Sequence, residues 1–212
     1  MKFLHNLFSI SDISNKSTGF DTIQGYDDLK GIVRRALDAE SNYCLLFIGP
    51  PASAKTLFLE GILDIAGKKK RDGVYFDGSN TTNRILDVLE QERPRIICID
   101  ELDKMSRTFQ NQLLNFMESG RVKVDQMRRQ YDFEIKGAKV FASCNEISKI
   151  SKPLQSRFRK LFLHRYSEQK FLDVSEKVLP KLSQGVARYI GINVWRRQGD
   201  IRDTSCKAGR RP

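Results

Sequence analysis

The octapeptide GPPASAKT, residues 49–56, follows an apolar run and opens a second apolar segment. It nearly matches the phosphate-binding pattern of glycine, four free positions, glycine, lysine, and serine or threonine. Lys55 and Thr56 are in place, and Ala54 stands where the second glycine is expected. Backbone N–H groups of such a loop wrap phosphate oxygens, and the following helix points its positive end at them. The pattern therefore predicts a strand, a nucleotide-binding loop and a helix in that order.

The chemistry of this loop points to ATP and Mg²⁺. We expect Lys55 to reach the β- and γ-phosphates and the Thr56 hydroxyl to ligate Mg²⁺. We expect Ala54 to cost little, because glycine is needed only at positive φ or against a ligand, and alanine is a good helix former. The alternative is a plain strand-to-helix turn. The predicted nucleotide-binding residues are Gly49, Pro50, Pro51, Ala52, Ser53, Ala54, Lys55, Thr56 and Leu57.

A second motif strengthens the first. The apolar run RIICID, residues 95–100, ends in Asp100 and is followed by Glu101. Asp100 can hold the Mg²⁺ shell, and Glu101 can orient and polarise the attacking water. Acidic residues also favour the first turn of a helix, so an N-cap is the alternative for this pair. The two motifs together favour a nucleotide site.

Five short apolar runs predict the strands of an α/β fold. They cover residues 43–49, 73–79, 95–100, 138–145 and 159–164, and they lack polar alternation, which is typical of strands buried on both faces. Helical patterns at 54–66, 81–93 and 106–120 lie between them, the last from a Ser106 cap to Gly120. We expect a doubly wound, five-stranded parallel sheet.

Two further segments depart from this alternation. Residues 121–126 and 130–137 predict an inserted β-hairpin outside the main sheet, with Met127, Arg128 and Arg129 near its tip. Beyond residue 166 the pattern is helical, at 167–182, 184–195 and 200–210. The expected division is an N-terminal arm (1–19), an α/β nucleotide-binding domain (20–166) and a small helical domain (167–212).

The composition limits the class of partner and the cellular compartment that we expect. The formal charge of +11 and the pI near 9.6 favour an anionic partner modestly. The widely spaced Cys44, Cys98, Cys144 and Cys206 are typical of buried thiols in a reducing cytosol. No apolar stretch approaches the roughly 20 residues that cross a bilayer. We expect a soluble, cytoplasmic protein with no membrane contact.

With these residues in view, the chain from about residue 20 onward resembles the AAA+ ATPases. Residues 49–56 are similar to their Walker A motif and 96–101 to Walker B. The resemblance implies a helical lid at 167–212 and these site residues: Ile23 and Gly25 as adenine contacts, Asn145 as sensor 1, Arg157 as the arginine finger, and Arg202 as sensor 2. Arg159 is the rival finger. Asn145 could instead cap a turn, and the arginines could be ordinary surface residues.

The hairpin before Asn145 resembles the pre-sensor-1 hairpin group, which includes RuvB, the minichromosome-maintenance helicases, Lon and MoxR. The segments IDELDKMSRTFQNQLLNFMESG and PLQSRF look closer to RuvB than to the other members. After the lid we expect no winged-helix DNA-binding domain of the RuvB kind, so the substrate stays open.

This resemblance implies Mg²⁺-dependent ATP hydrolysis in a homo-oligomeric ring, usually a hexamer. The leading hypothesis is a RuvB-like DNA motor or helicase subunit that contacts DNA through the 123–139 hairpin. Its basic residues are Lys123, Arg128, Arg129, Lys136 and Lys139. A solvated charged hairpin is the plain alternative. The competing functions are a MoxR-like protein-remodelling ATPase and a nucleotide-gated scaffold with little turnover.

Overall fold

The structure is a computed structural model, and it describes residues 19–21, 23, 25–51, 53–68, 73–79, 84–126, 129–179 and 181–196. The strands are β1 (Tyr43–Ile48), β2 (Gly73–Asp77), β3 (Ile96–Asp100), β4 (Arg121–Gln126), β5 (Arg129–Glu134), β6 (Lys139–Cys144) and β7 (Arg159–Phe162). The helices are α1 (Asp27–Asp38), α2 (Lys55–Lys68), α3 (Arg84–Glu92), α4 (Arg107–Ser119), α5 (Lys152–Arg157), α6 (Glu168–Val178) and α7 (Gln184–Arg196). Two 3-10 turns, η2 (Leu102–Lys104) and η3 (Ile147–Lys149), follow β3 and β6.

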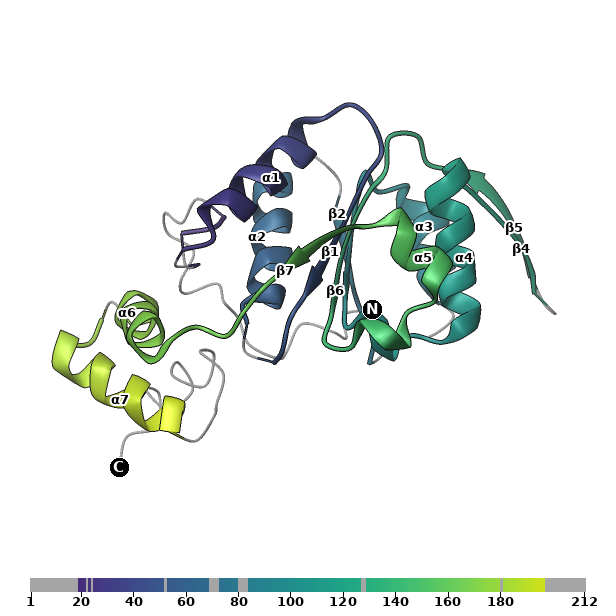
Figure 1. Cartoon of the computed structure of the whole chain (residues 1–212). Helices are drawn as coiled ribbons and strands as arrows, with labels where there is room; N and C mark the ends of the chain where they lie inside the picture. The colour runs from purple at the N-terminus through teal and green to yellow at the C-terminus, as the bar shows by residue number, and fades with distance from the viewer. Residues whose placement is uncertain are drawn as a thin grey trace.

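The main sheet has five parallel strands in the order β2-β3-β6-β1-β7 (Figure 1). This confirms the predicted doubly wound α/β fold. Because β6 lies between β3 and β1, the carboxyl ends of these three strands meet at one edge. Ile48, the last residue of β1, pairs with Cys144 at the end of β6. The loop after β1 and the acids after β3 therefore open on the same edge of the sheet.

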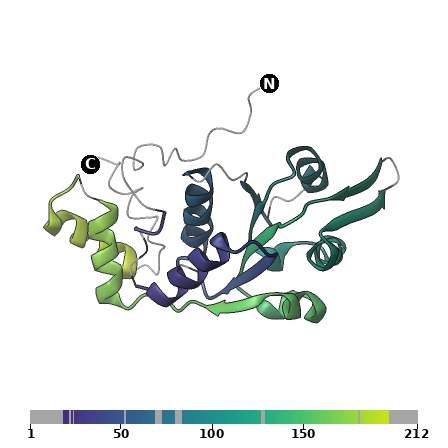
Figure 2. The ribbon, with the colours of Figure 1, turned by 90° about the horizontal axis from the view of Figure 1, so that it is seen from above.

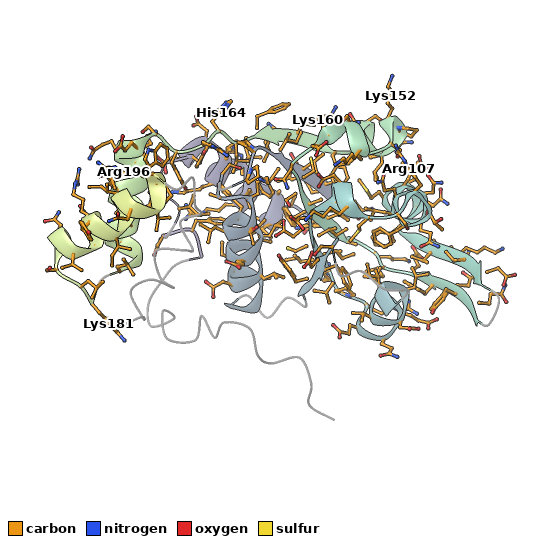
Figure 3. All side chains as sticks on the ribbon, turned by 90° about the horizontal axis from the view of Figure 1, so that it is seen from below. Arg107, Lys152, Lys160, His164, Lys181 and Arg196 are labelled. Atoms are coloured by element: carbon orange, nitrogen blue, oxygen red, sulfur yellow. The ribbon has the colours of Figure 1, made fainter. Side chains whose placement is uncertain are left out.

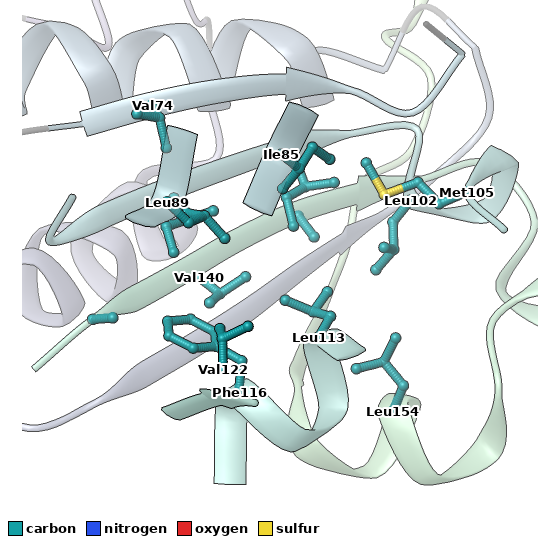
Figure 4. Packing of buried hydrophobic residues seen from close by; sticks show 14 of the residues in the cluster. Val74, Ile85, Leu89, Leu102, Met105, Leu113, Phe116, Val122, Val140 and Leu154 are labelled. Carbon is teal, nitrogen blue, oxygen red and sulfur yellow. The ribbon is translucent and has the colours of Figure 1, made fainter. Parts of the chain in front are cut away.

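Helices cover both faces of the sheet. Figures 1 and 2 show α1 and α2 on one side, and α3, α4 and α5 on the other. Neighbouring residues of β1 pack into opposite layers, since Leu46 joins the core under α3 and α4 while Phe47 stacks on Phe58 of α2 at 5.1 Å. Figure 4 shows the first layer, with Val140 of β6 near Phe116 of α4. Burial on both faces explains the unbroken apolar runs of the strands.

Helix α4 has the ends that its sequence predicts. The Ser106 hydroxyl accepts a hydrogen bond from the amide of Phe109 at 3.2 Å, which satisfies one of the unpaired donors of the first turn. At the other end Gly120 has φ +70°, and its amide bonds to the Phe116 carbonyl. Only glycine adopts this left-handed conformation without strain, so the helix ends there.

The inserted hairpin is confirmed as a separate two-stranded antiparallel sheet, β4-β5. One face joins the core, where Val122 and Phe133 pair across the strands and are both buried. The Tyr131 hydroxyl donates to Asp87 of α3 at 2.8 Å. The hairpin is thus anchored to α3 and α4, and its far end projects away from α6 and α7 (Figures 1 and 2). The predicted tip residues Met127 and Arg128 lie outside the described residues.

One residue assigned to the basic hairpin does not belong to it. Lys139 is only 6% exposed and begins β6. Its ammonium group donates to the carbonyls of Leu37 (2.7 Å) and Ala39 (2.5 Å), at the C-terminal end of α1. A cation at this end of a helix satisfies unpaired carbonyls and the negative end of the dipole. The prediction that Lys139 contributes to a DNA-binding surface was therefore wrong.

The C-terminal part contains α6 and α7, as the helical pattern predicts. The Ser167 hydroxyl caps α6, and the rings of Phe171 and Trp195 join the two helices at 5.3 Å. The predicted third helix and Arg202 lie outside the described residues. Helix α5 was not predicted separately, because one and a half turns leave no periodic pattern to recognise. The division of the chain at residues 19 and 166 remains a prediction.

The described helices include none that is long and apolar enough to span a membrane. Cys44, Cys98 and Cys144 are free thiols in the described strands, and the last two are buried. Burial raises the pKa of Cys44 to about 11 and that of Cys144 to about 12. Both thiols therefore stay protonated and unreactive at neutral pH, which agrees with the predicted structural role. Cys206 lies outside the described residues.

Replacing Lys139 tests the anchoring of α1 against the sheet. Lys139→Met is expected to lower the free energy of unfolding by about 2 kcal/mol, because buried carbonyls lose their donor. Lys123→Met, on the exposed face of the hairpin, is the matched control and is expected to change stability by less than about 0.5 kcal/mol. Urea unfolding of both variants measures the difference, and equal effects would contradict the assigned role of Lys139.

Candidate active site

The loop at residues 49–56 connects β1 to α2 and lies against the segment after β7. A Cβ atom on Gly49 would come within 2.4 Å of the Leu163 carbonyl oxygen and 2.7 Å of the Ser53 hydroxyl. Real side chains do not pack this closely, so only glycine fits at the first position of the loop. The predicted strand–loop–helix arrangement is confirmed, although Ala52 lies outside the described residues.

Ala54 has a backbone conformation that corrects our expectation. Its φ is +66°, and α2 begins only at Lys55. Ala54 is therefore in the left-handed region and is not the first residue of the helix. That conformation costs a residue with a Cβ about 1–2 kcal/mol, so the prediction of a nearly free substitution was wrong. The usual glycine of this motif stands where φ is positive, and this chain tolerates the strain.

The Lys55 side chain lies across the predicted phosphate-binding loop. Its ammonium group donates to the carbonyls of Gly49 (2.8 Å) and Pro50 (2.7 Å) and to the Ser53 hydroxyl (3.2 Å). The side chain is 7% exposed, so it is held inside the loop by these contacts. Phosphate oxygens in the loop would compete with neutral carbonyls for the same protons, and charge-assisted hydrogen bonds are the stronger ones.

The two predicted metal ligands meet, although they are 44 residues apart in the sequence. The Thr56 hydroxyl donates to Asp100 Oδ2 at 2.8 Å. A hydroxyl and a carboxylate are hard oxygen ligands of the kind that Mg²⁺ prefers, and Mg²⁺ is usually held by one or two carboxylates together with substrate phosphates. The donor set therefore fits Mg²⁺, which Thr56 and Asp100 would hold.

Two partners of Asp100 were missed by the sequence analysis. The Tyr75 hydroxyl, on β2, donates to Oδ2 at 2.8 Å, and the Ser143 hydroxyl, on β6, donates to Oδ1. Ser143 is fully buried within a strand that is otherwise apolar after Lys139, which is an unusual place for a hydroxyl. That break in the apolar run was the available signal. Tyr75 gave none, because tyrosine is common in strands.

Glu101 follows Asp100 in a left-handed conformation, with φ +52°. Its carboxylate pairs with the ammonium group of Lys104 at 2.6 Å, and this contact raises the pKa of Lys104. Its amide donates to Asp100 Oδ1 and to Ser143, each at 3.1 Å. The side chain therefore leaves the strand at a sharp turn and lies at the edge of the sheet beside the loop.

Asn145 lies at the same edge, just after β6. Asp103 of η2 accepts hydrogen bonds from the amides of Asn145 (3.3 Å) and Glu146 (3.0 Å). Asp103 is 7% exposed, and its Oδ1 atom has no hydrogen-bond partner among the described residues. This carboxylate ties the turn after β3 to the turn after β6. Its role was missed, because only the fold brings the two turns together.

The model of the ATPase family associated with various cellular activities (AAA) matches residues 45–166, more than half of the chain. The chain belongs to the AAA family. The loop, the acid pair and Asn145 all lie within the matched segment.

Individual relatives are more distant. Replication factor C subunit 4 of Homo sapiens is 23% identical over 209 residues, covering 86% of this chain and 52% of that protein. Two RuvB variants from Thermotoga maritima have TM-scores of 0.65 and 0.62, at 18% and 17% identity. Each match covers 83% of this chain, and the two matches cover 60% and 59% of the respective RuvB chains. The AAA chain spans about half to three fifths of these proteins, and the RuvB likeness shows the fold alone.

The two finger candidates lie apart from this AAA chain's own loop. Arg157 ends α5 and pairs with Glu118 of α4. Arg159 pairs in the β7 register with Leu45, three residues before the end of β1, and donates to the Tyr43 hydroxyl at 3.2 Å. Neither arginine forms a described contact with the loop.

The remaining predicted residues are only partly described. Ile23 is 2% exposed and packs in the core with Phe20 and Phe58. Its carbonyl accepts from Lys30 at 2.6 Å. Gly25 has φ +71°. Their role as adenine contacts stays a prediction, as do the roles of Leu57 and Arg202.

Glycine at position 54 tests the strain in the loop. Ala54→Gly is expected to raise the free energy of unfolding by up to about 1 kcal/mol, because relief of the left-handed strain exceeds the entropy that glycine adds to the unfolded chain. Ala187→Gly, inside α7 and fully buried, is expected to lower it by about 1 kcal/mol or more. Denaturant unfolding separates the two signs, and a loss of stability in Ala54→Gly would refute the strain.

Proposed function

We propose that this chain binds Mg²⁺ and ATP at the edge shared by β1, β3 and β6 and hydrolyses the γ-phosphate. The observation that carries the proposal is the 2.8 Å contact between Thr56 and Asp100, which joins the loop to the acid pair. Lys55 holds the β- and γ-phosphates, and Thr56 and Asp100 hold the metal. Bound Mg²⁺ neutralises charge on the phosphate oxygens.

Glu101 and Asn145 are the proposed residues that act on the attacking water. Glu101 is the group that polarises it, because it directly follows the metal ligand Asp100 in the sequence and its side chain is 30% exposed. Asn145 orients the same water from the end of β6. The Lys104 ammonium is also exposed, so exchanging it for water costs little, since exposed ion pairs contribute roughly 1 kcal/mol or less.

The site is completed by a neighbouring subunit in a ring, with six subunits by family resemblance. Arg157 is the proposed finger, because the resemblance to the AAA+ ATPases places the finger at this position, and Arg159 is its rival. Its side chain is 50% exposed and that of Glu118 is 43% exposed, so their ion pair is weak and can exchange for a γ-phosphate. Arg202, Ile23 and Gly25 are the proposed lid and adenine contacts of the same site.

Mixing two inactive variants tests the shared site. Lys55→Ala is expected to abolish ATP binding, Glu101→Gln to bind without turnover, and Arg157→Ala to bind with turnover reduced by roughly 10³-fold or more. A mixture of Arg157→Ala with Glu101→Gln should recover part of the ATPase rate, because some interfaces receive both intact groups. A mixture with no recovery, measured by phosphate release, would mean that Arg157 does not act in trans.

We further propose that the remodelled substrate is DNA. The support is a relative named as a replication factor subunit and a formal charge of +11. In the described strands of the hairpin, the basic side chains of Arg121 and Lys123 lie opposite acidic ones, so these residues do not account for the net positive charge. Arg121 pairs with Asp132, and Lys123 lies opposite the same aspartate. The proposed hairpin contact therefore depends on Arg128 and Arg129, which the sequence places at the turn.

A second basic surface lies along α5 and β7. Figure 3 shows Lys152, Lys160 and His164 along one edge of the molecule. The side chain of Phe162, between the last two, is 59% exposed. Lys160 forms no ion pair among the described residues, which leaves its charge available to a phosphate. This edge is the rival to the hairpin as a DNA contact.

Charge reversal separates the two surfaces. Arg128→Glu is expected to weaken DNA binding and to lower the slope of log K against log salt by about 1, because one phosphate contact is lost. Lys181→Glu is the control. Lys181 is exposed and lies at the other end of the molecule from the hairpin (Figure 3), so this variant should leave the slope unchanged. Fluorescence anisotropy over a salt series measures both variants. An effect of Lys160→Glu alone would move the contact to the β7 edge, and ATPase stimulated only by a polypeptide would favour a protein remodeller.

A further inference from the structure

The carboxylate of Asp100 is saturated with hydrogen bonds. Oδ2 accepts from the Thr56 and Tyr75 hydroxyls, each at 2.8 Å. Oδ1 accepts from the Ser143 hydroxyl and from the Glu101 amide, the latter at 3.1 Å. A carboxylate offers about four lone-pair sites, and four donors occupy them here. A metal ion that binds Asp100, directly or through a coordinated water, needs one of these sites.

Of the four donors, only the Tyr75 hydroxyl can move away from Asp100 without disturbing the backbone, the core or the metal site. The Glu101 amide belongs to the backbone, and Ser143 is fully buried in β6. Thr56 has to stay, because its oxygen is a ligand of the same metal. Tyr75 is 40% exposed, so its ring can turn toward solvent without opening a cavity in the core. Strand β2 is an edge strand of the sheet, and among the described residues no further strand pairs with it on its outer side.

The backbone next to Tyr75 is fixed, so the movement is confined to its side chain. The Gly78 amide donates to the Asp100 carbonyl at 2.8 Å, which holds the end of β2 against β3. A Cβ on Gly78 would lie 2.2 Å from the Glu101 carbonyl oxygen, so the two segments approach as closely as glycine allows. The hydroxyl of Tyr75 is the adjustable part of this edge.

We propose that Tyr75 is a positioning residue that competes with Mg²⁺ for Asp100. Its hydroxyl holds one lone-pair site of the carboxylate and is released when the metal binds, so it raises the Mg²⁺ concentration that ATP binding requires. The inference rests on the proposed function of this site and adds a residue that sets its metal dependence.

The surroundings of Tyr75 keep its hydroxyl a donor. Burial raises its pKa, and the nearby carboxylates of Asp100, Glu60 and Asp77 raise it further, so the phenol does not ionise at physiological pH. A neutral phenol can always donate to Asp100, and the competition does not depend on pH in this range.

Nucleotide binding tests the competition without turnover. In the Glu101→Gln background, the affinity for a fluorescent ATP analogue is titrated against Mg²⁺, with EDTA as the zero-metal point. Tyr75→Phe is expected to lower the half-saturating Mg²⁺ concentration about three- to tenfold. It should leave affinity in EDTA unchanged, since one hydrogen bond to a charged group is removed from the metal-free side only. Tyr75→Leu, which removes the ring as well, should shift it in the same direction.

Tyr131→Phe is the matched control, because it removes a tyrosine–carboxylate hydrogen bond of the same length on β5. It should leave the Mg²⁺ dependence unchanged. An unchanged or raised half-saturating concentration in Tyr75→Phe would overturn the inference, and a raised value would mean that Tyr75 orients Asp100 for the metal. If the Glu101→Gln protein binds no analogue at any Mg²⁺ concentration, the proposed function itself fails.

Discussion

The whole site depends on one nearly buried carboxylate. Asp100 is 7% exposed at the end of β3, and an unpaired charge in that position would be strongly destabilising. Its hydrogen bonds come from α2, β2, β6 and the following amide. These hydrogen bonds offset the cost of burying the charge. They also hold the ends of β2, β3 and β6 close to the loop. The charge needed for the metal is thus also the link between the elements that surround it.

Two residues with left-handed backbone belong to the segments that carry Thr56 and Asp100. Ala54 and Glu101 have φ of +66° and +52°, and they lie directly before α2 and η2. Left-handed backbone at residues other than glycine persists only where the surroundings enforce it. Here a helix begins directly after Ala54, and the Glu101 amide is bonded to both Asp100 and Ser143. The strain directs Lys55 and the Glu101 carboxylate toward the same edge.

Much of this could be read from local patterns. Five apolar runs predicted the five strands, because parallel strands buried on both faces leave continuous hydrophobic sequence. Ser106 and Gly120 predicted the ends of α4, since a cap depends on only a few neighbouring residues. Predictions failed where the deciding contact was distant. Lys139 was grouped with the hairpin by sequence proximity, yet it bonds to carbonyls about 100 residues earlier.

The sequence by itself determined the strands of the sheet, the hairpin, the loop, the acid pair and the family, because each depends on residue types at short spacing. The tertiary structure alone decided which donors reach Asp100, that Asp103 joins two turns, and that Ala54 is left-handed. The parallel pairing of β6 with β3, for example, brings Ser143 and Asn145 into hydrogen-bond contact with residues 42 positions earlier. Short-range patterns contain no information about such distances, since the chain between the partners can take many paths.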